Sequence, residues 1–98
     1  MEKGTRNEYL LIFTDVSLKD LAFHDKAGNQ TTIKRIDRIL KELETTPFTG
    51  IGNPHPLSYD YAGLWSRHLN KKDVIIYSVK EKEKTVHIYS ARYHYFDT

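Results

Sequence analysis

The sequence contains no cysteine, and it has few prolines and glycines, three and five respectively among 98 residues. Without thiols, neither a disulfide framework nor a thiolate metal site can form. Long hydrophobic runs are also absent, since the apolar stretches at residues 9–13 and 74–79 are far shorter than the roughly 20 residues that span a bilayer. Residues 1–4 lack the apolar core of a secretory signal. From these absences we expect a soluble cytoplasmic protein with no membrane partner.

A chain of 98 residues is long enough for one hydrophobic core, so we expect residues 1–98 to form a single domain. A domain of this size buries about 60–70% of its unfolded surface, which leaves little interior for a deep pocket. An active site is therefore expected to be a shallow groove. Such a groove suits a polymeric substrate better than a small metabolite.

The formal net charge is only +2, but the positive residues lie in clusters. Local basic stripes matter more to a nucleic-acid partner than the total charge does. The first cluster could equally be the solvated face of a helix. Aromatic residues are concentrated near the C-terminus, where they could stack on unpaired bases or pack within the fold. The two basic clusters consist of Lys34, Arg35, Arg38 and Lys41, and of Arg67, Lys71 and Lys72.

The N-terminal half predicts one strand followed by two helices. The continuous apolar run at residues 9–13 has the length of a buried strand. Asp15 is a candidate cap for a helix over residues 16–26, in which Leu18, Leu21 and Ala22 recur at helical spacing. After Gly28 and Asn29, a second helix is predicted over residues 30–44. Its apolar stripe consists of Ile33, Ile36, Ile39, Leu40 and Leu43.

The C-terminal half predicts a loop and then antiparallel strands. Residues 46–56 are rich in glycine and proline, and strands are predicted over residues 63–69, 74–79 and 85–91, with a further short strand at residues 57–61. Alternation in the first of these strands places Ser66 and His68 on one face and Trp65 and Arg67 on the other. We therefore expect an α+β fold: an N-terminal strand, two helices and a three- to four-stranded antiparallel sheet covered by the helices on one face.

Three motifs stand out from this general pattern. They read T-P-F-T-G-I-G-N-P-H-P-L at residues 46–57, L-W-S-R-H at residues 64–68 and A-R-Y-H-Y at residues 91–95. The chain resembles the YoeB/Txe family of the RelE/ParE toxin superfamily, whose pattern is T-P-F-x-G-x-G-x-P-E-P-L, then G-x-W-S-R-R, then a terminal R-Y-H-Y. The match is ungapped from Thr46 to Tyr77 and resumes at Ala91. The resemblance implies the RelE-like microbial RNase fold.

This resemblance also implies the toxin of a type II toxin–antitoxin system that acts as a ribosome-dependent mRNA endonuclease. In such toxins the 2′-hydroxyl of the message attacks the neighbouring phosphate, with no metal or cofactor. That chemistry needs a base, cations near the phosphate and an acid for the leaving oxygen. The implied partners are mRNA, the ribosome with its rRNA, and a cognate antitoxin whose C-terminal segment wraps the toxin. A homodimer is a further candidate assembly.

The resemblance assigns roles to individual residues. His94 matches the family's histidine acid, and Tyr95 matches the tyrosine that orients the substrate. His55 stands where the family has a glutamate that acts as general base, and a histidine can do this work because its unperturbed pKa is about 6.5. The expected contacts to RNA phosphates are Arg67, His68, Lys71, Lys72 and Arg92.

One departure weakens the match. Val74 stands where the family has an arginine that binds phosphate, and losing one such donor typically costs about 3–4 kcal/mol of transition-state stabilisation. A second hypothesis is therefore an inactive homologue that keeps antitoxin and ribosome binding. A third is a gyrase-targeting ParE-like toxin, although the intact R-Y-H-Y ending speaks against it. The histidines lack the spacing of a zinc motif, so no metal site is predicted.

Overall fold

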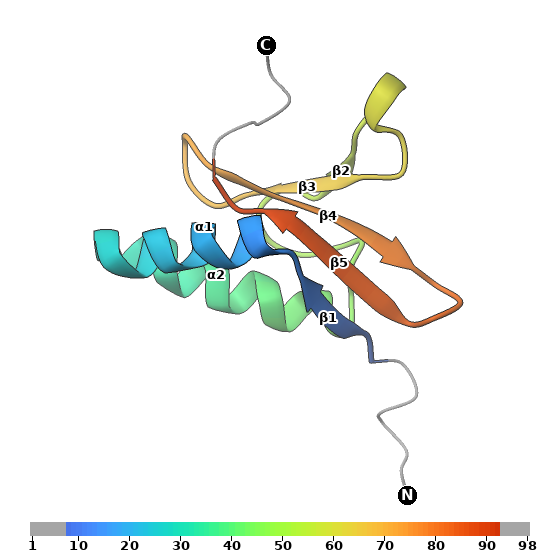
Figure 1. Cartoon of the computed structure of the whole chain (residues 1–98), viewed down its shortest axis with the longest axis horizontal. Coiled ribbons are helices and arrows are strands. Elements are labelled where there is room, and N and C mark those ends of the chain that lie inside the picture. Colours follow the sequence, from blue (N-terminus) through green and yellow to red (C-terminus); the bar gives the residue numbers. More distant parts are fainter. Residues whose placement is uncertain (1–7, 93–98) are drawn as a thin grey trace, which may run out of the picture.

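The computed structural model describes residues 8–92, which form two α-helices packed on one side of a β-sheet (Figure 1). This confirms the α+β class and the order of the expected elements. His94 and Tyr95 lie outside the described residues. In chain order the elements are β1 (Leu10–Phe13), α1 (Asp15–Ala27), α2 (Gln30–Leu43), β2 (His55–Pro56), the 3₁₀ helix η2 (Tyr59–Tyr61), β3 (Trp65–His68), β4 (Val74–Lys80) and β5 (Thr85–Ser90).

The described sheet has five strands in the order β1-β5-β4-β3-β2. Strands β2 to β5 pair antiparallel, as expected, whereas β1 pairs parallel with β5 and makes the sheet mixed. A short apolar run does not indicate its own partner, so this pairing was not predicted. The expected strand at residues 57–61 is wrong. Tyr59 has a left-handed φ of 59°, which turns the chain into η2 instead of continuing the ladder.

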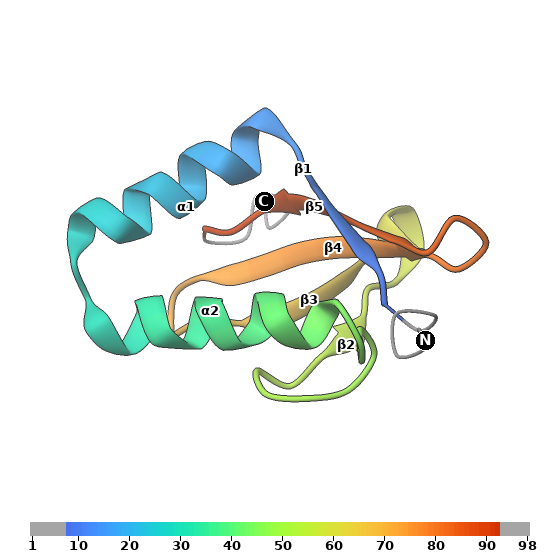
Figure 2. The same cartoon turned by 90° about the horizontal axis from the view of Figure 1, so that it is seen from below.

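Local capping sets the ends of both helices. The predicted cap Asp15 is in fact the first residue of α1, and Thr14 caps the helix by accepting a hydrogen bond from the Ser17 N–H at 3.0 Å. Gly28 ends α1 with a φ of 76° and donates its N–H to the carbonyl of His24. Asn29 then caps α2 by accepting from the Thr32 N–H. This short turn joins two antiparallel helices (Figure 2).

The hydrophobic core lies between α2 and the helix-facing side of β4 and β5. Ile39 and Leu43 of α2 are fully buried, as are Ile75, Tyr77 and Ile88 of the sheet. Full burial of a large aliphatic side chain contributes about 1.5–3 kcal/mol. This confirms the apolar stripe that the sequence predicts for the second helix.

Helix α1 buries a different kind of face. Its buried residues are Ser17, Asp20 and His24, while Leu18 is 51% exposed. Leu18 therefore does not belong to the inward face that its helical spacing suggested. Leu21 does pack against the core. No helix among the described residues combines the length and apolar character needed to cross a membrane.

Candidate functional site

His55 lies at the start of β2, on an exposed edge of the sheet. Its Nδ1 is 3.1 Å from the carbonyl oxygen of Asn53. A carbonyl oxygen only accepts hydrogen bonds, so Nδ1 must carry the proton in this contact. In the neutral ring, Nε2 is then the unprotonated nitrogen. It faces the Ser66 hydroxyl at 3.5 Å, which is too long for a strong bond and leaves Nε2 available as a proton acceptor.

His68 lies beside His55 on the same face of the sheet. The pairing of β2 with β3 puts His55 opposite Ser66, and His68 follows two residues later with its side chain on the same side. The two imidazole centroids are 6.4 Å apart, and both rings are exposed. The structure thus brings together two of the residues that the sequence predicted, close enough for both to contact one phosphate group.

A basic hollow begins at His68 and extends toward α2. It has a volume of about 440 Å³ and is lined by Arg35, His68, Asn70 and Lys71. Asn70 holds the β3–β4 turn in place, because its Oδ1 accepts from the backbone N–H groups of Lys72 and Asp73 and its Nδ2 donates to the Thr32 hydroxyl. The bond to Thr32 ties this turn to α2, one helical turn before Arg35.

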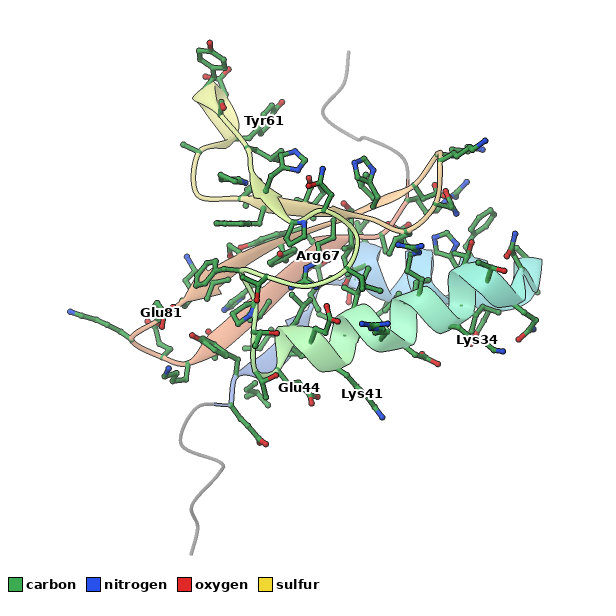
Figure 3. The ribbon with its side chains drawn as sticks, turned by 180° about the vertical axis from the view of Figure 1, so that it is seen from behind. Lys34, Lys41, Glu44, Tyr61, Arg67 and Glu81 are labelled. Carbon is green, nitrogen blue, oxygen red and sulfur yellow. The ribbon has the colours of Figure 1, made fainter. Side chains whose placement is uncertain are left out.

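Arg35 is the residue of this hollow that sequence reasoning missed as a site residue. Arg35 belongs to a basic cluster that could also be a solvated helix face. Only the fold shows that it lies next to His68 and Lys71. Lys34 and Lys41 of the same cluster point outward from α2 (Figure 3). Lys72 does not line the hollow, so its predicted phosphate contact stays a prediction.

The predicted phosphate contact of Arg67 does not fit the structure. The Arg67 side chain is fully buried beneath residues 46–51, between the sheet and α2 (Figure 3). Its guanidinium donates to the Glu42 carboxylate at 2.6 Å, to the Tyr77 hydroxyl, and to the carbonyls of Thr46 and Thr49. With every nitrogen engaged and no exposed surface, Arg67 organises the loop and does not reach a phosphate.

The same contacts explain the glycine-rich motif. At Gly50, where φ is 131°, a Cβ atom would lie 1.9 Å from Glu42 Oε1 and 2.8 Å from Arg67 Nη1, so a side chain there would collide with the ion pair. Tyr77 adds a hydrogen bond to the Pro47 carbonyl at 2.8 Å. The first part of the motif, residues 46–51, therefore forms a loop that Glu42, Arg67 and Tyr77 hold in place ahead of His55.

Glu42 is the charged partner in this loop. Burial alone would raise the pKa of its carboxyl, but hydrogen bonds from the Ile51 N–H, from Arg67 and from Arg38 outweigh this effect. The pKa of Glu42 consequently lies below its ordinary value. For Tyr77, burial raises the pKa, and the neighbouring Arg67 offsets only part of the rise. Glu42 is thus held ionised and Tyr77 neutral near pH 7.

Val74 lies directly opposite His68 across the β3–β4 pair and is 1% exposed. The family pattern has an arginine at this position, and a valine offers no donor to a phosphate. The hollow that begins at His68, the partner of Val74 across the pair, is lined by the cations Arg35 and Lys71. Trp65 packs against Phe48 at the loop, with ring centroids 5.0 Å apart, and this contact assigns it to packing within the fold.

Arg92 was also expected to contact phosphate. Its guanidinium instead lies over the ring of Phe23 on α1, 3.7 Å from the ring centroid. Arg92 is therefore engaged with the helix layer and not presented in the basic hollow.

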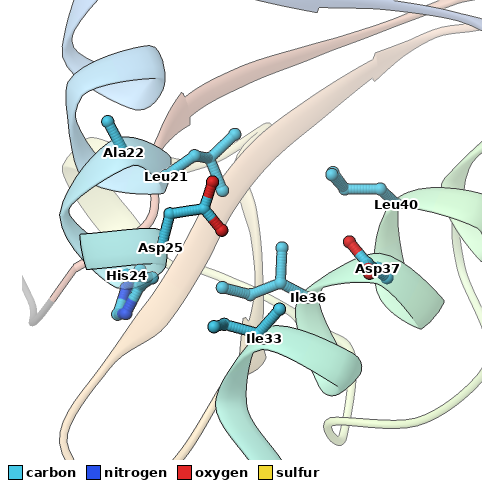
Figure 4. Close-up of a pocket in the computed structure, with 8 residues that line it drawn as sticks. All are labelled: Leu21, Ala22, His24, Asp25, Ile33, Ile36, Asp37 and Leu40. Atoms are coloured by element: carbon cyan, nitrogen blue, oxygen red, sulfur yellow. The ribbon is translucent and has the colours of Figure 1, made fainter. Parts of the chain in front are cut away.

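A second hollow, of about 310 Å³, lies between α1 and α2 (Figure 4). Its walls are mainly apolar, with Leu21 facing Ile33, Ile36 and Leu40, and its charged members Asp25 and Asp37 are acidic. A negative rim repels a phosphate backbone, so this hollow is not the substrate site. No group of three potential metal ligands occurs within residues 8–92.

The fold is that of a small α+β protein with an exposed histidine pair beside a basic hollow. Residues 13–95 match the family model of the YoeB-like toxin of bacterial type II toxin–antitoxin systems. A curated Toxin YoeB from Synechocystis sp. is 31% identical over 84 residues, which cover 82% of this chain and 95% of the relative. The chain therefore belongs to the YoeB-like toxins of type II toxin–antitoxin systems.

Solved structures agree with this family assignment. A YoeB/ParE toxin from Agrobacterium tumefaciens has a TM-score of 0.79 and 29% identity, covering 88% of this chain and 99% of that one. A YoeB dimer from Staphylococcus aureus has a TM-score of 0.76 and 25% identity, covering 90% and 99% of the two chains. A YoeB–YefM complex from the same organism has a TM-score of 0.74 and 26% identity, covering 89% and 98%.

Proposed function

We propose that this toxin is a ribosome-dependent mRNA endonuclease that cleaves by attack of a 2′-hydroxyl on the adjacent phosphate, with no metal. The observation that carries the proposal is the exposed His55, whose Nδ1–H donates to the Asn53 carbonyl and whose Nε2 is left as an acceptor beside His68. Membership of the YoeB-like toxins supports it. Action on ribosomes would place the protein in the cytoplasm.

His55 is the general base of this proposal. Its Nε2 takes the proton of the 2′-hydroxyl while the 2′-oxygen forms a bond to phosphorus. The bond from phosphorus to the 5′-oxygen then breaks, and the 5′-oxygen leaves with a proton from the acid. The products are a 2′,3′-cyclic phosphate and a 5′-hydroxyl. By the family pattern the acid is His94, and Tyr95 orients the substrate.

Arg35, His68 and Lys71 are proposed to stabilise the charge that develops on the phosphate. A fixed donor aimed at such a charge is typically worth about 3–4 kcal/mol. Val74 provides none, so the basic hollow must supply what the family arginine supplies elsewhere. The hydrogen bond from Asn70 to Thr32 at 3.1 Å holds two of these cations, Arg35 and Lys71, on neighbouring elements.

The proposed protein partner is an antitoxin. The S. aureus YoeB has been solved in complex with YefM and also as a dimer, and this chain shares its fold over most of its length. A C-terminal antitoxin segment that folds on binding would cover a wide surface, including the basic hollow, at a cost in ordering entropy. A homodimer of the free toxin is proposed on the same likeness.

Primer extension on a defined message translated by purified ribosomes tests the proposed function. Wild-type protein is expected to cut the message, and His55→Ala or His94→Ala to reduce cutting by about 100-fold or more, as loss of a general base or acid does. His87→Ala is the matched control, because His87 lies on β5, which β4 separates from the strands of His55 and His68, and this variant should cut normally. Wild-type protein that leaves the message intact would contradict the proposal.

A second candidate function is an inactive toxin homologue that keeps its binding partners. The buried Val74 favours it, since the phosphate donor of the family is missing at this place in the sheet. The double variant Val74→Arg/His55→Glu separates the two candidates. If wild-type protein is inert and the double variant cuts, the homologue is inactive, whereas cutting by wild-type protein that is lost in His55→Ala supports the nuclease.

A further inference from the structure

The inward face of α1 carries polar side chains that bind the backbone just past the end of β5. Ser17, Asp20 and His24 recur at spacings of three and four residues, so they share one side of the helix, and all three are buried. The helix contacts β5 along this side. Buried polar groups need partners, and those of Asp20 and His24 are both found at Ala91.

Ala91 is held by both of its backbone polar groups. Its N–H donates to Asp20 Oδ2 at 2.8 Å, and its carbonyl oxygen lies 2.6 Å from His24 Nε2. The carbonyl can only accept, so Nε2 of His24 carries the proton in this contact. Ala91 is fully buried, which shields both hydrogen bonds from water. We call this pair of contacts the Ala91 clamp.

The clamp begins where the strand pairing stops. The last β5 residue paired with β4 is Ser90, opposite Ile76, and the register shifts between Ile76 and Tyr77. Ala91 thus lies one residue beyond the ladder, and side chains of α1 take the place of a strand partner. The next residue, Arg92, stacks on Phe23 of the same helix. Residues 91 and 92, just past the end of β5, are thus contacted by Asp20, Phe23 and His24, which lie within about one turn of α1.

Holding a strand end with a buried aspartate and a buried histidine is costly compared with apolar packing, because both groups must be removed from water. In exchange, the two short hydrogen bonds define the position and orientation of the Ala91 backbone. Residues that hold reacting groups in place need this kind of definition, since a displacement of about 1 Å can reduce a rate by about 100-fold.

We propose that Asp20 and His24 are positioning residues that fix the position and orientation of Ala91, the first residue of the C-terminal motif. The inference rests on the proposed function, in which His94 is the acid, and His94 follows Ala91 by three residues. Neither Asp20 nor His24 touches substrate in this scheme. Both act through the backbone of Ala91, and the sequence motif at residues 91–95 works only when its first residue is clamped.

The test compares variants that remove the clamp with variants that preserve it. Asp20→Ala and His24→Ala delete the acceptor and the donor. Asp20→Asn keeps an oxygen for the Ala91 N–H, and His24→Gln keeps an N–H at nearly the position of Nε2. Asp25→Asn, on the exposed side of the same helix, is the matched control. Cleavage is measured on programmed ribosomes, at a temperature at which every variant is shown to be folded.

The expected result is a fall in kcat of about 100-fold for the two alanine variants, with KM little changed because binding to the ribosome does not use the clamp. Asp20→Asn and His24→Gln should recover most of kcat, and Asp25→Asn should match the wild type. Alanine variants that stay folded and cleave at the wild-type rate would overturn the proposal. A rise in KM at constant kcat would also overturn it.

Amide hydrogen exchange at Ala91 separates this inference from the proposed function, because it needs no activity. In Asp20→Ala the Ala91 amide should exchange much faster, while the amide of Ile76 in the central strand should not change. Unchanged exchange at Ala91 would show that the clamp does not exist and would overturn the inference directly. Wild-type protein that never cleaves would overturn the proposed function, and the positioning role with it, even where exchange shows the clamp to be present.

Discussion

The two helices cover the same face of the sheet by opposite means. Helix α2 buries Ile36, Ile39 and Leu43, so it is held by packing that has no direction of its own. Helix α1 buries Ser17, Asp20 and His24, and it is held by hydrogen bonds to named backbone groups. Packing gives stability, and hydrogen bonds give a defined position. We conclude that α2 stabilises the fold and α1 places the end of β5.

The largest expected effect concerns Arg67 of β3, which joins Glu42 of α2 to the loop at residues 46–51. Arg67→Met removes the guanidinium that binds Glu42 and the carbonyls of residues 46 and 49, and leaves these buried acceptors unpaired. We expect a loss of about 3–5 kcal/mol in the free energy of unfolding, measured by urea denaturation. A loss below about 1 kcal/mol, the range of an exposed ion pair, would mean that Arg67 does not organise the loop.

The next effect compares leucines on the two helices. Leu43→Ala on α2 leaves a cavity in the core and should cost about 2–5 kcal/mol. Leu18→Ala on α1 removes a half-exposed side chain and should change stability by no more than about 0.5 kcal/mol. Thermal and urea denaturation of the two variants side by side provide the measurement. Equal losses would contradict the difference drawn between the helices.

The helix caps should show a smaller difference. Asn29→Ala removes one capping bond from α2 and is expected to cost about 1 kcal/mol. Thr14→Ala should cost more, because the Thr14 hydroxyl also donates to the carbonyl of Tyr89 at 3.0 Å and so joins α1 to β5. Denaturation midpoints of the two variants decide the order. A larger loss for Asn29→Ala would show that the contact between Thr14 and β5 adds nothing.

The smallest effect is a dependence on pH. Because the pKa of Glu42 is lowered in the folded protein, its ionised form favours folding. That contribution is present at neutral pH and is lost as the pH falls from the ordinary glutamate pKa of about 4.3 through the lower folded value. Wild-type protein should therefore lose more stability between pH 7 and pH 3 than Glu42→Gln does. Parallel losses would contradict the assigned shift.

Most of the fold could be predicted from the sequence, because local patterns determine its elements. The isoleucine stripe fixed the second helix and its buried face, and alternation placed Ser66 and His68 opposite Arg67. The parallel pairing of β1 could not be predicted, since it depends on two helices returning the chain to the sheet. The buried face of α1 could not be predicted either. Its buried residues are polar, and their burial makes sense only once their distant hydrogen-bond partners are known.

The structure leaves the predicted surface histidines exposed, whereas it buries Arg67 in the interior. His55 was expected as the base and His68 as a phosphate contact, and the structure places their exposed rings 6.4 Å apart. Arg67 also matches the family pattern, but a match does not say what the residue does. Its full burial and its bonds to the loop carbonyls show that it organises the loop. The partners of Arg35 and His24 could not be predicted, because they come from segments about 35 and 67 residues away in the chain.

The most direct test of the central claim is cleavage of a message that carries one 2′-deoxynucleotide at the mapped cut site, presented on programmed ribosomes. The account predicts that wild-type protein cuts the ordinary message to a 2′,3′-cyclic phosphate and a 5′-hydroxyl, and that the single deoxy substitution abolishes the cut at that position. Cleavage that persists at the deoxy position would contradict the account, because the 2′-oxygen would then not be the nucleophile and His55 would have no proton to accept.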